Sequence, residues 1–201
     1  VVDDDDDDND DDVTTKSSLL KDLTNDVVLI LLCFGANDAC DEKKNVFNQH
    51  VDLKTYESNL NLIIDTFLKK CPEARVVVAT PTPLHREKYL AWKKSSKFPH
   101  NANKTSDELE DRSTSLVKPY AETMRRVVSA KKERVALCDW HEDFLSSSAP
   151  PLPDLLSDGL HFSAKGDELA FRSILKTIEN NFPDFVVTKD PITNSFSNSG
   201  S

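Results

Sequence analysis

Residues 27–38 read VVLILLCFGAND, a run of eight apolar residues followed by a turn sequence. A short apolar run of this kind is typical of a strand buried on both faces, as in a parallel sheet. Gly35 and Asn37 mark a turn directly after the run. We therefore expect a buried parallel strand with polar side chains at its carboxyl end.

Two more apolar strands and three helices are predicted downstream, in alternation. The strands are expected at 75–80 and 134–139, and the helices, which have apolar residues at helical spacing, at 52–70, about 107–130 and 163–180. This alternation predicts an α/β fold with a parallel sheet and right-handed crossovers. In such sheets chemistry collects beyond the carboxyl ends of the strands, so a site is expected there.

Residues near the helix ends support these boundaries. Asp52 and Ser163 are predicted N-caps, because their side-chain oxygens can accept from the first free backbone N–H groups. If the helix predicted at about 107–130 begins near Leu116, Pro119 lies in its first turn, where a missing N–H costs little. The polar stretch 85–105 is interpreted as an irregular connection.

The length of 201 residues suits one domain. We expect an acidic disordered segment at 1–25, the folded domain at 26–183 and a polar tail at 184–201. The tract 3–12 supplies nine negative charges of a net −10, so the rest is close to neutral (−10 + 9 = −1). A run of like charges repels itself and stays solvated. Since no basic patch is present, a nucleic-acid partner is not expected.

The four cysteines match no zinc-binding spacing, and Cys33 and Cys138 lie in predicted strands. They are interpreted as free thiols of a reducing compartment, so a cytoplasmic location is expected. No signal peptide and no membrane-spanning apolar run is visible, so a membrane partner is not expected. The oligomeric state stays open.

Asp158 and His161 lie three residues apart, just before the last predicted helix. A turn at Gly159 would fold the carboxylate back onto the imidazole, where it would orient the ring and favour the imidazolium. Taken alone, the pair more often marks a helix N-terminus that carries a solvated histidine. His141 is expected to be a partly exposed loop residue.

Asn37 is the second candidate, at the end of the first strand. Its side-chain amide can donate a hydrogen bond to an oxyanion, whereas Gly and Asn are also common in ordinary turns. Neither Asn37 nor the pair Asp158 and His161 identifies a site by itself.

Together these segments resemble the SGNH/GDSL-type hydrolases, and within them the isoamyl acetate-hydrolysing esterase branch. The resemblance covers about residues 27–182 and is most specific at five places, which are Gly35 to Asp38, Gln49 to Leu60, Thr80 to Leu84, Cys138 to Trp140 and Leu156 to Gly166. It implies a three-layer, flavodoxin-like fold with a parallel sheet, incomplete at the N-terminus.

The resemblance also implies roles for individual residues. His161 resembles the catalytic general base and Asp158 the carboxylate that orients it. Asn37 resembles the oxyanion donor, and Gly35 lets the backbone pass close to the substrate. The implied reaction is hydrolysis of small acetate-like or other short acyl esters through an acyl-serine, without a metal or an organic cofactor.

The Gly-Asp-Ser segment that supplies the family's nucleophile is missing from this chain. The four glycines are Gly35, Gly159, Gly166 and Gly200, and none precedes an Asp-Ser pair. We therefore expect a C-terminal fragment of a serine esterase that is inactive alone, with an apolar strand edge left exposed. The alternative is a non-catalytic relative that serves as a binding module. A nucleotide-binding domain is disfavoured, because no Gly-rich phosphate loop occurs.

Overall fold

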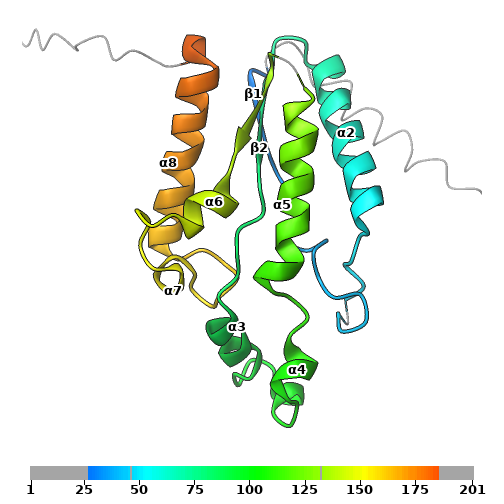
Figure 1. Cartoon of the computed structure of the whole chain (residues 1–201), viewed down its shortest axis with the longest axis vertical. Coiled ribbons are helices and arrows are strands. Elements are labelled where there is room, and N and C mark those ends of the chain that lie inside the picture. Colours follow the sequence, from blue (N-terminus) through cyan, green and yellow to red (C-terminus); the bar gives the residue numbers. More distant parts are fainter. Residues whose placement is uncertain (1–26, 46, 132, 186–201) are drawn as a thin grey trace, which may run out of the picture.

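The structure is a computed structural model that describes residues 27–185 except 46 and 132 (Figure 1). The predicted acidic segment at 1–25 and nearly all of the predicted tail at 184–201 lie outside the described residues. Their assignment, and with it the domain boundaries, stays a prediction.

Three strands form one parallel sheet in the order β1-β2-β3. They are β1 (Leu29–Cys33), β2 (Arg75–Ala79) and β3 (Val135–Cys138). In register, Leu31 lies opposite Val77, which lies opposite Ala136. All three predicted strands are confirmed, each slightly shorter than its apolar run.

Helices cover both faces of the sheet, which gives the predicted three layers (Figure 1). Helices α2 (Leu53–Lys70) and α5 (Thr114–Ser129) lie on one face, and α8 (Ala164–Asn181) lies on the other. The side chains of Ile30 and Val78 pack with those of α2 and α5 in one core cluster. Those of Val77 and Cys138 pack with α8 in a second cluster. The apolar side of each of these helices thus packs against the strands, as expected.

The shorter elements gather at the carboxyl end of the sheet. They are α3 (Arg86–Lys93), η1 (Pro99–Asn101), α4 (Ser106–Leu109), α6 (Trp140–Leu145) and α7 (Leu152–Leu155), and η2 (Pro183–Phe185) follows α8 at the other end. None of the helices in the described part of the chain is long and apolar enough to cross a membrane.

Both predicted N-caps are confirmed. Asp52 accepts from the backbone N–H groups of Lys54 and Thr55, and Ser163 accepts from that of Gly166. These bonds fix where α2 and α8 begin.

The single helix predicted at 107–130 is wrong, because the chain forms two helices there. Thr105 starts α4 with a capping box, and Ser113 caps α5 separately. Between them the chain turns to bury Asp111 and Arg112. Since α5 starts at Thr114, Pro119 lies inside the helix rather than in its first turn.

The irregular connection predicted at 85–105 is also wrong. It contains α3 and η1, and α3 buries only Tyr89 and Leu90. With so few buried positions, the apolar pattern of α3 is too weak to predict a helix.

Strand β1 was expected to be buried on both faces, and only one face is. Ile30 and Leu32 are buried, whereas Leu29 is 37% and Leu31 44% exposed. The physical reason is position, since β1 is the edge strand of the sheet that the described residues form and α8 covers this face over β2 and β3. Within the described residues, the expected exposed apolar edge is therefore present.

Candidate active site

Asp158 and His161 are joined as the sequence predicts. Nδ1 of His161 lies 2.7 Å from Oδ2 of Asp158, and the backbone N–H of His161 donates to Oδ1 at 2.8 Å. Partial burial raises the pKa of Asp158, but the hydrogen bonds from the backbone and ring of His161 outweigh it, so the net pKa lies below its usual value. The carboxylate therefore stays charged and holds the ring with Nε2 turned away from it.

Gly159 makes the tight turn between the pair possible. Its φ is +91°, and a Cβ atom there would lie 2.4 Å from the backbone N of Tyr89 and 2.5 Å from the carbonyl O of His85. The carbonyl of Gly159 accepts from the backbone N–H of His85 at 2.9 Å. The turn is thus in direct contact with the start of α3.

Asn37 follows β1 on a turn that its neighbours hold. The backbone N–H of Gly35 donates to Asp38 at 3.2 Å, and the Ala36 carbonyl accepts from the guanidinium of Arg112. Gly35 has φ +106°, and a Cβ there would meet the hydroxyl of Tyr56 at 2.9 Å. Gly35 is therefore required for the turn that carries Asn37 past the end of β1.

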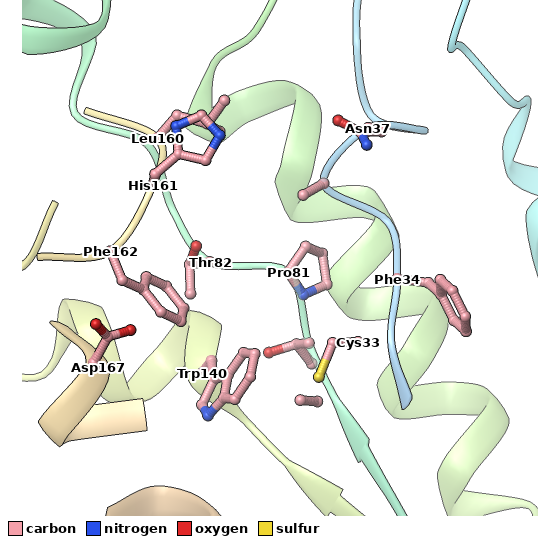
Figure 2. Close-up of a pocket in the computed structure, with 13 residues that line it drawn as sticks. Cys33, Phe34, Asn37, Pro81, Thr82, Trp140, Leu160, His161, Phe162 and Asp167 are labelled. Carbon is pink, nitrogen blue, oxygen red and sulfur yellow. The ribbon is translucent and has the colours of Figure 1, made fainter. Parts of the chain in front are cut away.

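A hollow of about 440 Å³ opens beyond the carboxyl ends of the three strands. Its lining comes from the segments after β1, β2 and β3 and from the loop before α8, and includes Asn37, Pro81, Trp140, His161 and Phe162. Figure 2 shows Asn37 and His161 at one end of this hollow, with Cys33 and Trp140 at the other. The polar candidates thus face a mainly apolar space that is also lined by two threonines and Asp167.

A second hollow of about 430 Å³ also contains Asn37 and His161 in its lining. One wall carries Trp92 and Phe98, whose rings meet edge to face at 4.8 Å. The Trp92 ring lies 5.9 Å from the His161 ring. The two hollows therefore meet at His161.

Asp111 and Arg112 lie at the bottom of the second hollow and are 3% and 6% exposed. Asp111 accepts from Lys93 and from the hydroxyl of Tyr89, each at 2.6 Å. Burial raises the pKa of Asp111, but the bonds from Lys93 and Tyr89 outweigh it and lower the pKa overall. The sequence analysis did not single out this cluster, because its partners are far apart in sequence.

A second, half-buried network supports the end of β3. Arg125 donates to both carboxylate oxygens of Asp139, at 2.7 and 2.9 Å, and the hydroxyl of Thr80 donates to the same carboxylate at 3.1 Å. That hydroxyl oxygen accepts from the backbone N–H of His141 at 2.9 Å. The prediction for His141 is wrong: it lies in α6, is 3% exposed, and its Nδ1 has no partner in the described structure.

A family model described as "GDSL-like Lipase/Acylhydrolase family" matches residues 5–169. The chain belongs to this family. The match spans both Asn37 and the turn from Asp158 to His161, so the GDSL assignment rests on the same segments as the site geometry.

Named relatives from three kingdoms support the GDSL assignment. An isoamyl acetate-hydrolyzing esterase 1 homolog from Homo sapiens is 32% identical over 154 residues, which are 76% of this chain and 56% of that protein. The isoamyl acetate-hydrolyzing esterase of Saccharomyces cerevisiae is 28% identical, over 84% of this chain and 63% of its own length. A GDSL esterase/lipase from Arabidopsis thaliana is 27% identical, over 75% and 58%. The chain thus spans less than two thirds of these relatives.

Solved structures agree with the fold of the family. A protein titled a putative platelet activating factor from Streptococcus pneumonia matches with a TM-score of 0.55 and 19% identity, over 75% of this chain and 59% of that one. An acetylxylan esterase from Geobacillus stearothermophilus matches with a TM-score of 0.52 and 12% identity, over 83% and 65%. At these identities the likeness concerns the α/β fold alone.

Two serines flank the pair in this GDSL member, and neither points a free hydroxyl at it. The hydroxyl of Ser157 donates to the His161 carbonyl at 3.1 Å, and that of Ser163 donates to the Asp154 carbonyl at 2.6 Å. Among the described residues, no group of three or more His, Cys, Asp and Glu side chains is placed to hold a metal ion.

Proposed function

We propose that Asp158, His161 and Asn37 are the base and oxyanion half of a serine-esterase site that acts on short-chain or acetate esters. The 2.7 Å contact between Nδ1 of His161 and Asp158, at a hollow that also holds Asn37, carries the proposal. The family to which the chain belongs supports the class of reaction.

In the proposed reaction, Nε2 of His161 takes the proton of a serine hydroxyl as its oxygen bonds to the ester carbonyl carbon. The side-chain amide of Asn37 donates to the resulting oxyanion, and Gly35 allows the backbone to pass close to it. The imidazolium, stabilised by Asp158, then gives its proton to the departing alcohol oxygen. A water molecule releases the acyl group by the same two proton transfers, so no metal or organic cofactor is needed.

The nucleophile in this proposal comes from polypeptide outside these 201 residues. The sequence contains no Gly-Asp-Ser segment, and the hydroxyls of Ser157 and Ser163 are bonded to backbone carbonyls. A site that lacks its serine loses nearly all of its catalysis. We therefore propose that the chain alone does not hydrolyse esters above background.

The proposed partner is a small-molecule ester rather than a nucleic acid or a membrane. The four cysteines are free thiols, which supports the proposal that the protein works in the reducing cytoplasm.

A chimera tests the proposal. The region of the human relative upstream of its matched segment is fused to Val27, and hydrolysis of 4-nitrophenyl acetate is measured. We expect activity in the chimera, none in the 201-residue chain, and a loss of about a thousandfold or more in the His161→Ala chimera. Lys176→Gln, on the exposed side of α8, is the control.

Two results would contradict the proposal. One is labelling of the 201-residue chain by a serine-reactive fluorophosphonate probe. The other is a folded chimera whose activity survives His161→Ala. A folded but inactive chimera would favour the second candidate, a non-catalytic binding module, for which the missing Gly-Asp-Ser segment is the supporting observation.

A further inference from the structure

The guanidinium of Arg112 is a buried cation without an ion-pair partner among the described residues. It is 6% exposed, and its hydrogen bonds go to the neutral carbonyl of Ala36 and, at 2.7 Å, to the neutral side-chain oxygen of Gln49. The neighbouring Asp111 forms its salt bridge with Lys93 instead. Asp111 is thus paired with the half-buried Lys93, and within the described residues the buried charge of Arg112 has no carboxylate in an ion pair with it.

Burying an uncompensated charge is costly, because neutral acceptors satisfy a guanidinium's donors but not its charge. The hydrogen bonds to Ala36 and Gln49 therefore explain where the Arg112 side chain lies, but they do not balance its positive charge. An anion bound in the adjoining hollow would balance it. A guanidinium presents five donors, of which carboxylate and phosphate are the preferred partners.

The second hollow has the composition of such an anion site. Its lining contains the four cationic side chains Lys44, Lys93, Lys104 and Arg112 and only the two carboxylates Glu108 and Asp111. Glu108 accepts from the backbone N–H and hydroxyl of Thr105 through one oxygen and lies near Lys104, and Asp111 is paired with Lys93. The lining thus carries two more cationic side chains than carboxylates, which favours an anionic ligand.

The aromatic wall adds a second requirement. Trp92 and Phe98 line the same hollow as Arg112 and His161, and the Trp92 ring packs against the His161 ring. Such a wall suits a flat apolar group. A ligand that reaches from His161 to Arg112 thus needs a planar body and an anionic end.

The position of His161 decides which part of an ester enters this hollow. The imidazolium has to give its proton to the leaving alcohol oxygen, so the alcohol part lies beside His161. The second hollow, which His161 lines, is also lined by Trp92 and Arg112. Resting on the proposed function, we infer that the alcohol part of the substrate carries a planar apolar body and a carboxylate or phosphate that Arg112 and Lys104 bind.

Binding to the 201-residue chain tests this inference without catalysis. The chain has two tryptophans, so the Trp140→Phe variant leaves Trp92 as the fluorescent reporter in the hollow. It is titrated with 4-acetoxybenzoate, with the neutral methyl ester of that compound, and with phenyl phosphate. We expect at least one of the two anions to bind about tenfold more tightly than the methyl ester, with the difference shrinking in about 0.5 M NaCl. The tighter of the two identifies the anion as carboxylate or phosphate.

Two substitutions test which side chains cause the tighter binding of the anion than of the methyl ester. Arg112→Gln should abolish this preference, and Lys104→Gln should reduce it about threefold. Lys176→Gln, which removes an exposed lysine outside the hollow, should leave it unchanged. If Arg112→Gln fails to fold because the Ala36 carbonyl loses its donor, Lys104→Gln still decides the question.

Equal binding of anions and methyl ester would overturn the inference, and so would a preference that survives both Arg112→Gln and Lys104→Gln. The preference for the anion over the methyl ester should persist in His161→Ala, because this substitution removes the proposed base and leaves the anion-binding side chains in place. The binding test is thereby separate from the test of the proposed function. Conversely, a chimera that hydrolyses 4-nitrophenyl acetate without favouring 4-acetoxybenzoate would support the esterase and reject the anion site.

Discussion

Asp158 holds His161 at two points, with Oδ2 2.7 Å from the ring Nδ1 and Oδ1 accepting the backbone N–H at 2.8 Å. One carboxylate thus fixes both the main chain and the ring of the same residue. The orientation of the imidazole is consequently set within a single turn of chain, before α8 begins.

Asp158→Asn separates these two functions of the carboxylate. Asn retains an oxygen that can accept the backbone bonds, but it places an amide NH₂ toward Nδ1 and so favours the wrong ring tautomer. In the chimera we expect kcat to fall about a thousandfold or more with an unchanged circular dichroism spectrum. Asp154→Asn, an exposed residue paired with Lys165, is the control. Wild-type kcat in Asp158→Asn would contradict the orienting role.

Gly159→Ala should destabilise the fold more than Gly35→Ala. At Gly159 the new Cβ would meet backbone atoms of α3 at 2.4 and 2.5 Å, whereas at Gly35 it would meet the side chain of Tyr56 at 2.9 Å. Both have positive φ, so each substitution carries backbone strain of about 1–3 kcal/mol, and only Gly159→Ala adds a clash that backbone atoms have to relieve. Urea denaturation measures the free energy of unfolding of both variants. A larger loss in Gly35→Ala than in Gly159→Ala would show that the turn at Gly159 is not held against α3.

Asp111→Asn tests the buried charge cluster. The pKa of Asp111 is below its usual value, so its contribution to stability is complete above about pH 4 and is lost as the pH falls through the lower folded pKa. At pH 7 we expect Asp111→Asn to cost about 3 kcal/mol, because Lys93 loses its carboxylate partner and the hydroxyl of Tyr89 loses a charged acceptor. In urea denaturation, the difference in the free energy of unfolding between wild type and Asp111→Asn should become smaller below pH 4. A constant difference across pH would contradict this assignment.

His141→Gln tests a second pH window. Burial, together with the nearby charge of Arg125, lowers the pKa of His141 even though Asp139 and Glu142 lie close to it. Because the folded pKa lies below the unfolded value of about 6.5, wild-type stability should fall as the pH drops from about 6.5 through the folded pKa. In thermal melts, the Tm should decrease less between pH 7 and pH 5 in His141→Gln than in wild type. The exposed His100→Gln is the control, and an equal decrease in both variants would count against the prediction.

Cys33 should be the cysteine that reacts in the folded chain, and it should react slowly. It is exposed whereas Cys40, Cys71 and Cys138 are buried, yet desolvation of its sulfur and the neighbouring Cys138 raise its pKa to about 11. Little thiolate is present at neutral pH, so alkylation by iodoacetamide should accelerate steeply from pH 7 to 9. Mass spectrometry identifies the labelled residue. Rapid labelling of a second cysteine at pH 7 would indicate that the sheet opens.

The sequence predicts the sheet and the flanking helices α2 and α8 well, because their apolar periodicity is strong. It fails where burial is confined to two or three residues, as in α3, or where a polar side chain is buried, as with His141. The pair Asp158 and His161 was predictable, since both residues lie within one turn. The cluster around Arg112 was not, because its bonds to Ala36 and Gln49 cross more than sixty positions of sequence.

The contact between α3 and the Gly159 turn has a consequence for how this protein can change in evolution. Besides the Gly159 bond, Nζ of Lys88 donates to the carbonyls of Pro153 and Leu156, each at 2.7 Å. The helix that carries Trp92 is thereby fastened to the loop that carries His161. Gene recombination that exchanged α3 without residues 153–161 would break these bonds, so the two segments should be inherited together and new ester preferences should arise by point substitution within them.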